Sequence, residues 1–110
     1  MLIVTILLVH WIADFVLQKQ EWANNKSKSV IALGKHCAVY SLCLTPFIFP
    51  FGVMYWAINS VGHFLIDFCT SKVTSKLYLK GDYHNFFVVI GFDQLLHYML
   101  LFYPFVLQVK

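Results

Sequence analysis

The sequence predicts an all-α membrane protein, folded as a bundle of four transmembrane helices. Hydrophobic residues make up 60% of its 110 residues and charged residues only 12%, a composition outside the range of ordinary soluble domains. The apolar residues form four runs, none of which alternates with the period of a barrel strand. Because backbone groups in lipid must be hydrogen-bonded within the chain, we expect each run to be a helix. At this length we expect a single polytopic domain over residues 1–110.

The first two helices are predicted over residues 2–18 and 30–46. The first is short but within the length range of a spanning helix. We expect it to be retained, because it lacks the basic start and the small-residue cleavage site of a signal peptide. Trp22, in the polar stretch that follows, is a candidate interfacial anchor. Ser29 is a candidate N-cap of the second helix, which weakens at Pro46.

The third and fourth helices are predicted over residues 52–70 and 86–104. The lysine-containing stretch between them, residues 71–85, is predicted to be a polar connection. Asn85 is a candidate N-cap of the fourth helix, which fades near Pro104. The chain therefore has three connections, and their charges can orient it in a membrane.

Lysines lie in the first and third connections, whereas the second has no charged residue. They are Lys19, Lys26 and Lys28 in the first connection and Lys72, Lys76 and Lys80 in the third. The positive-inside rule predicts that both basic connections face the cytoplasm and that both termini lie outside. The lysines never form a continuous patch, which argues against nucleic acid as a partner.

Three helices carry a histidine and an aspartate four residues apart, a spacing that places both side chains on one face of a helix. The pairs are His10 and Asp14, His63 and Asp67, and Asp93 and His97. The third pair has the reverse order, and its helix runs antiparallel to the other two. We therefore expect the aspartates to share one layer and the histidines to share a second layer roughly 6 Å deeper. His36, early in the second helix, falls near the carboxylate layer.

Ionisable groups inside membrane helices are costly to bury and usually mark a functional site. A divalent ion (zinc, or manganese or iron) would neutralise the carboxylates, and imidazole and carboxylate groups both bind such ions. The predicted metal ligands are His10, Asp14, His63, Asp67, Asp93 and His97. His36 and Asp67 are the candidate catalytic residues, with a general base supplied by His36 or by an aspartate that does not bind metal. Gln18 and Gln94 would orient a ligand or the attacking water.

Two further expectations concern the surroundings of the site. Lys35 and Lys72 are predicted to be close enough to the site to reach an anionic head group. Small residues beside the polar positions would let the helices approach closely. These are Ala13, Gly34, Gly62 and Gly91.

Four sequence motifs carry a resemblance to a known family. They are H-x-x-x-D-F-x-L-Q from His10 to Gln18, the lone His36, H-x-x-x-D from His63 to Asp67, and D-Q-x-x-H from Asp93 to His97. Over nearly the whole chain, the sequence resembles a family of small bacterial and phage membrane proteins, the domain of unknown function thirty-three-oh-seven. The resemblance implies a polytopic bacterial or phage membrane protein, and it brings no activity. We expect the protein in the bacterial inner (cytoplasmic) membrane, with several spans. A looser similarity, of residue type only, links the chain to membrane proteins named metal-dependent hydrolases.

The leading functional hypothesis is a metal-dependent hydrolase that acts on a membrane-associated, lipid-like substrate within the bilayer. One alternative is a proton or metal-ion transporter or channel, for which stacked aspartate and histidine layers are typical. The other is a non-catalytic membrane interaction protein, whose polar residues only pair the helices. The sequence leaves a homo-oligomer open.

Overall fold

The computed structural model describes residues 2–18 and 26–108, with side chains to residue 105, and contains no strand in these ranges. Four helical segments follow one another along the described chain. The first is α1 (Leu2–Trp11) continued by the π-helix η1 (Ile12–Val16), and the second is α3 (Val30–Leu44) continued by the 3-10 turn η2 (Thr45–Phe47) and by α4 (Ile48–Phe51). The third is α5 (Val53–Leu79) and the fourth is α6 (Tyr83–Gln108). The all-helical prediction is confirmed for these residues, whereas Lys19 and the predicted anchor Trp22 lie outside them.

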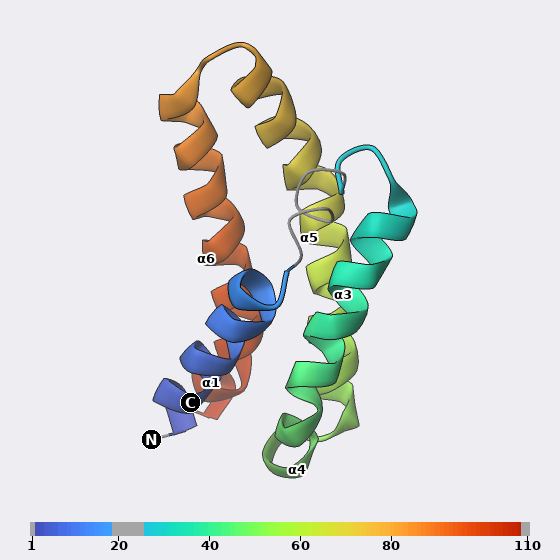
Figure 1. Cartoon of the computed structure of the whole chain (residues 1–110). Coiled ribbons are helices and arrows are strands. Elements are labelled where there is room, and N and C mark those ends of the chain that lie inside the picture. Colours follow the sequence, from blue (N-terminus) through green and yellow to red (C-terminus); the bar gives the residue numbers. More distant parts are fainter. Residues whose placement is uncertain (1, 19–25, 109–110) are drawn as a thin grey trace.

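The longest helices, α5 and α6, form an antiparallel hairpin, and the other segments pack against it (Figure 1). Helix α3 runs along α5 (Figure 1), and α1 meets α6 at His10, whose ring centroid lies 5.3 Å from that of Tyr98. An apolar cluster fills the interior on the side away from that turn. It consists of Ile6, Ala13, Tyr40, Leu44, Phe47, Tyr55 and Leu101.

Helix α5 continues well beyond the predicted end at residue 70, so most of the predicted polar connection is helical. No glycine or proline interrupts this stretch before Gly81, which adopts a positive φ of 75° and ends the helix. The predicted N-cap Asn85 is wrong, because α6 begins earlier, at Tyr83. Asp82 caps it instead: its Oδ1 accepts from the Asn85 backbone N–H (3.2 Å), and its Oδ2 accepts from the Asn85 side chain (2.8 Å). These bonds, the side-chain one foremost, hold the pKa of the Asp82 carboxyl below its ordinary value.

The predicted start of α3 agrees with the structure, whereas the predicted end of α6 near Pro104 does not. Ser29 caps α3 as predicted, because its Oγ accepts from the Ala32 backbone N–H at 3.2 Å. Pro104, however, lies inside α6, which runs on to Gln108. A proline has no N–H to donate to the carbonyl four residues earlier, here Leu100. The side-chain Nδ2 of Asn59 donates to that carbonyl at 3.2 Å, which compensates the break.

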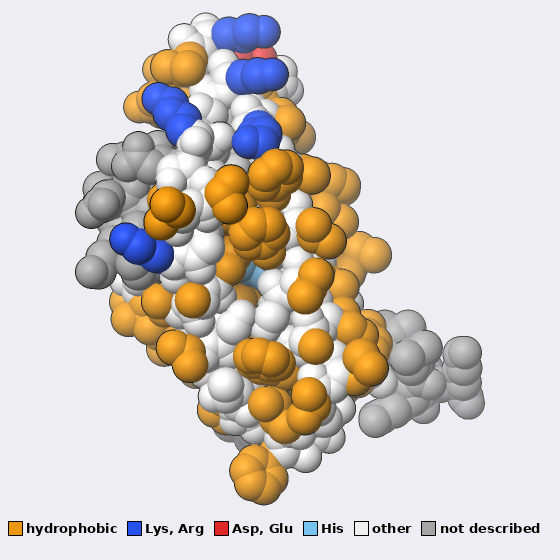
Figure 2. Space-filling model, turned by 90° about the vertical axis from the view of Figure 1, so that its right-hand side faces the viewer, with side chains coloured by type: hydrophobic (Ala, Val, Ile, Leu, Met, Phe, Trp, Pro, Cys, Tyr) orange, Lys and Arg blue, Asp and Glu red, His pale blue; other side chains and the backbone are white. Residues whose placement is uncertain are grey.

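Two segments are long and apolar enough to cross a membrane, judged by length and composition. They are Val30–Phe51 and Tyr83–Phe105, and the apolar segment Leu2–Val16 is shorter. Helix α5 is not among them, so two of the four predicted spans meet this test. Large hydrophobic side chains stay exposed, such as Ile31 with 73% and Leu42 with 70% of its surface. Figure 2 shows them over most of one face, with most visible lysines gathered toward the end that carries the α5–α6 turn.

The close approach predicted at small residues is found at two of the four positions. Ala13 is fully buried, and a methyl group at Gly62 would meet the Leu100 side chain. At Gly34 and Gly91 a methyl group would have no described atom within 4 Å, so the prediction is wrong there. The α5–α6 pair is therefore closely packed at Gly62, whereas Gly34 and Gly91 do not serve helix packing.

Candidate functional site

One stripe of buried side chains on α5 organises the site. Tyr55, Asn59, His63, Asp67 and Ser71 follow at intervals of four residues and are the buried residues of this helix. At that spacing they lie on one face of the helix, which points into the bundle. The stripe leads from the apolar cluster, through a histidine and an aspartate, toward the α5–α6 turn.

Four side chains from three helical segments bring ligand-type atoms together; we call them the ligand group. The group consists of Asp14 from η1, His36 from α3, and His63 and Asp67 from α5. One nitrogen or carboxylate oxygen from each lies within 4.8 Å of the others. All four side chains are buried, the most exposed being Asp14 at 4%. The structure thus joins residues that are far apart in the sequence.

The spacings in the ligand group match those of a tetrahedral metal site. Nε2 of His36 lies 3.0 Å from Asp14 Oδ1, 3.3 Å from Asp67 Oδ2 and 3.0 Å from Nε2 of His63. Nε2 of His63 lies 3.4 Å from Asp67 Oδ2 and 3.8 Å from Asp14 Oδ1. Ligand atoms at about 2.0–2.1 Å around a tetrahedral ion are separated by about 3.3 Å. A divalent cation would therefore fit among these atoms with little movement of the side chains.

The electrostatics of the ligand group require protons or a cation between its atoms. Carboxylate oxygens only accept hydrogen bonds, and a neutral imidazole has one donor and one acceptor nitrogen. Two imidazole nitrogens and two carboxylate oxygens converge here, so their lone pairs repel unless protons or a metal ion lie between them. A single ion bound by all four atoms would satisfy them together.

A second group shares Asp14 with the first. It consists of Asp14, Asp93 and His97, all buried. His97 Nδ1 donates to the Asp93 backbone carbonyl at 2.7 Å, so the lone pair is on Nε2, which has no hydrogen-bond partner among the described atoms. Asp93 accepts from Thr70 Oγ1 at 2.6 Å and from Gln94 Nε2 at 3.0 Å. Gln94 also donates to Asp14 Oδ2 at 3.3 Å, and this donor orients both carboxylates.

His10, a predicted ligand, is placed beside these groups and belongs to neither. Its Nε2 donates to the Gln94 side-chain oxygen at 2.8 Å, and its Nδ1 lies 3.1 Å from the Tyr40 hydroxyl. Because both ring nitrogens are engaged, neither is free for a metal. His10 instead fixes Gln94, which in turn contacts the carboxylates. The predicted layers agree with the ring positions, since His97 lies beside both His10 and His63, with ring centroids 5.6 and 4.6 Å apart.

Lys26, predicted only as a basic residue of the first connection, lies at the site. Its Nζ lies 3.3 Å from Asp67 Oδ2, and its side chain is 22% exposed. No periodic pattern leads to it, because it lies outside the helices. Lys72 does not reach the ligand group: its Nζ donates to the Ser27 backbone carbonyl at 3.2 Å and so ties the segment that carries Lys26 to α5. Lys35, the other predicted head-group contact, is exposed on α3 and does not line the cavity beside the site.

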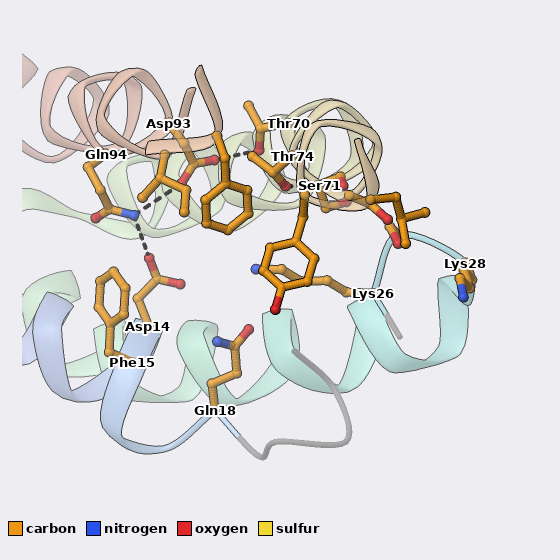
Figure 3. Close-up of a pocket in the computed structure, with 16 residues that line it drawn as sticks. Asp14, Phe15, Gln18, Lys26, Lys28, Thr70, Ser71, Thr74, Asp93 and Gln94 are labelled. Atoms are coloured by element: carbon orange, nitrogen blue, oxygen red, sulfur yellow. Dashed lines mark hydrogen bonds between the residues drawn. The ribbon is translucent and has the colours of Figure 1, made fainter. Parts of the chain in front are cut away.

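A cavity of about 620 Å³ adjoins the site on the side of the α5–α6 turn. Asp14, Asp93 and Gln94 form its inner end, and Lys26 reaches across it toward the ligand group (Figure 3). The remaining lining residues combine hydroxyls, amides and apolar side chains. They are Phe15, Gln18, Ser27, Lys28, Thr70, Ser71, Thr74, Ser75, Tyr78, Leu79, Phe86 and Ile90. A ligand in this cavity would lie directly against the carboxylates.

Comparison with known proteins identifies one family that the chain matches. A family model with the description "protein of unknown function (DUF3307)" matches residues 2–109, which is nearly the whole chain. No curated protein and no solved structure matches it.

Proposed function

Since the chain belongs to the DUF3307 family of proteins of unknown function, we propose its function from the site itself: a membrane-embedded, metal-dependent hydrolase. The observation that carries the proposal is the ligand group, in which four buried ligand atoms lie within 4.8 Å of one another. Its substrate would be an amphiphile with a polar head and an apolar tail. The polar head would occupy the cavity beside the site.

A membrane location is supported by two apolar segments and by the placement of charge. The molecule measures 44 Å along its longest axis, and a bilayer with its head groups is about 40–45 Å thick. Most visible lysines gather toward the α5–α6 turn (Figure 2), which the positive-inside rule would place in the cytoplasm. We propose a multi-pass protein of the bacterial inner membrane, with both termini outside.

The ligand group would hold one divalent ion, which leaves Asp93 and His97 of the second group free of metal. Zinc accepts tetrahedral sets of nitrogen and oxygen ligands, and manganese or iron accepts the same residue types. An ion so bound supplies a Lewis acid and an activated water. Because His36 and Asp67 lie inside the ligand group, their contribution would be to hold the ion.

Asp93 is the carboxylate placed to act as general base. It lines the cavity beside Asp14 of the ligand group, and hydrogen bonds from Thr70 and Gln94 fix its orientation. In the reaction, water adds through its oxygen to a phosphoryl or acyl centre, and the ester bond to the leaving oxygen breaks. Asp93 takes a proton from the water and returns it to the leaving oxygen, so that atoms and charge balance.

The surroundings of the site favour an enzyme over a transport path through one chain. On one side the groups open into the cavity, and on the other they meet the apolar cluster. Polar groups near that cluster bond locally, since the Tyr55 hydroxyl donates to the Leu101 carbonyl at 2.8 Å. A proton or ion leaving the histidines in that direction would meet buried apolar side chains.

The first test is metal content, measured by mass spectrometry on detergent-purified protein. We expect at least one zinc, manganese or iron per chain in the parent, and its loss from the double variant His63→Ala, Asp67→Ala. The matched control is Asp82→Ala, His84→Ala, which removes the same residue types next to the α5–α6 turn and should keep the metal. Circular dichroism would establish that both variants remain helical. A parent free of metal after incubation with each of the three ions would contradict the proposal.

A further inference from the structure

The cavity wall on α5 is built from hydroxyl side chains. Thr70, Ser71, Thr74, Ser75 and Tyr78 all line it. Ser71 is only 6% exposed, and its Oγ has no hydrogen-bond partner among the described residues. A buried hydroxyl without a partner is unfavourable, so Ser71 has a hydrogen bond to offer to a molecule in the cavity.

Two lysines face the same space from the segment that precedes α3. Figure 3 shows the Lys26 side chain crossing the cavity, with Lys28 at its outer end. Lysine ammonium groups and hydroxyl donors together are suited to phosphate oxygens, which only accept hydrogen bonds. The donors thus surround a space next to the proposed metal ligands, where a phosphate ester would have to lie for hydrolysis.

The position of Lys26 depends on what neutralises Asp67. In the structure, the Lys26 ammonium lies 3.3 Å from Asp67 Oδ2 and is a counter-ion of this carboxylate. A divalent ion in the ligand group would neutralise that carboxylate and repel the ammonium. The nearest alternative place for the Lys26 ammonium is the cavity. Metal binding would therefore add a free positive charge to the cavity.

The cavity also has an apolar side. Phe15, Leu79, Phe86 and Ile90 contribute to its lining together with the hydrophilic residues of α5 and the lysines. The volume of about 620 Å³ is that of a site for a small organic molecule, roughly 300–1,000 Å³. Inorganic phosphate alone would leave most of this space and the apolar wall unused.

From these observations we propose that the cavity binds the phosphate of an anionic amphiphile, and that Lys26 moves from Asp67 to this phosphate once a divalent ion is bound. The proposal rests on the proposed function and names its substrate class as a phosphate ester with an apolar tail. Lys26 and Ser71 are then binding residues, and the hydroxyls of α5 complete the phosphate site.

The test is calorimetric titration of the metal-loaded protein in detergent, with metal content measured on the same samples. The probes are dihexanoyl phosphatidic acid, inorganic phosphate and dihexanoyl glycerol, which separate the lipid phosphate from a free phosphate and from the tails alone. Lys26→Met removes the proposed phosphate contact, and Ser71→Ala removes a smaller one. Lys76→Met, an exposed lysine of α5 outside the cavity, is the matched control.

We expect phosphatidic acid to bind more tightly than either other probe. Lys26→Met should weaken it about tenfold or more, as for loss of a charge-assisted hydrogen bond, Ser71→Ala should weaken it less, and Lys76→Met should not change it. Lys26→Met should retain at least the metal content of the parent, because it removes a competitor for Asp67. Equal binding of all probes, or unchanged binding by Lys26→Met in a metal-loaded protein, would overturn this inference and leave the metal site intact. A metal-free parent would instead overturn the proposed function.

Discussion

The two ends of the buried stripe on α5 satisfy their polar groups in different ways. Near the apolar cluster each polar side chain has a local partner: Tyr55 donates to the Leu101 carbonyl, and Asn59 donates to the Tyr55 and Leu100 carbonyls. Farther along, Nε2 of His63 lies 3.0 Å from Nε2 of His36, and Asp67 pairs with Lys26 at 3.3 Å. Ser71 Oγ has no partner among the described atoms. The first arrangement is complete within the protein, whereas the second would be completed by the proposed ion and ligand.

Among the substitutions considered, removal of Asp14 should have the largest effect on the proposed metal site, because that carboxylate belongs to both groups. We expect Asp14→Ala to lose bound metal and the stabilisation that metal provides. An ion present at about 100 times its dissociation constant stabilises the fold by about 2.7 kcal/mol. A chelator should therefore lower the melting temperature of the parent and leave that of Asp14→Ala unchanged. Equal chelator responses would show that Asp14 does not bind the ion.

Gln94 orients the carboxylates of the site, because it donates to both Asp14 and Asp93 and accepts from His10. Gln94→Leu should weaken metal binding by about 10- to 100-fold, the usual effect of losing a group that orients the ligands. Titration of the metal-free protein with zinc measures it. The matched control is Gln18→Leu, since Gln18 Oε1 has no hydrogen-bond partner in the described part of the chain. An equal loss in both variants would mean that cavity polarity, and not the contact with the carboxylates, sets the affinity.

Substitutions at the end of the α5 stripe near the apolar cluster should lower the stability of the protein and leave its metal binding unchanged. Asn59→Ala leaves the Leu100 carbonyl without a donor, since Pro104 has no N–H to give it. We expect a cost of about 1–3 kcal/mol in the free energy of unfolding. In a Pro104→Ala background the helix can supply that N–H, so the cost of Asn59→Ala should fall. A double-mutant cycle in denaturant measures this coupling, and strictly additive effects would contradict the assigned role of Asn59.

Most of the site could be predicted from sequence because helical periodicity decides which side chains share a face. The four-residue pairs at His63 and Asp67 and at Asp93 and His97 needed only the helix and its direction. The partners of His10 could not be predicted, because they come from tertiary contacts with Gln94 and Tyr40. Lys26 lies outside the helices, where no repeating pattern restricts the backbone.

Some helix ends can likewise be predicted from the local sequence, whereas others depend on tertiary contacts. Ser29 could be identified as an N-cap, since a hydroxyl before an apolar run is a local signal. At α6 the predicted cap Asn85 lies three residues after the observed cap Asp82, because the chain re-enters a helix at Tyr83, directly after the turn at Gly81. The continuation of α6 beyond Pro104 depends on Asn59, a residue of another helix. Such compensation is invisible in a single segment of sequence.

Asp82 gives the smallest predicted effect, because it is a helix cap outside both groups. Its folded-state pKa lies below the ordinary value of the carboxyl, about 3.9, because Asn85 donates two hydrogen bonds to it. Its contribution to stability should be complete above that ordinary value and be lost as the pH falls through the lower folded-state pKa. We expect Asp82→Ala to melt slightly below the parent at neutral pH, with the difference shrinking below about pH 4. Melting curves of both proteins from pH 7 to pH 3 measure it, with Ser29→Ala as a cap without a charge whose effect should not depend on pH. A difference for Asp82→Ala that stays constant to pH 3 would mean that its carboxylate charge does not stabilise α6.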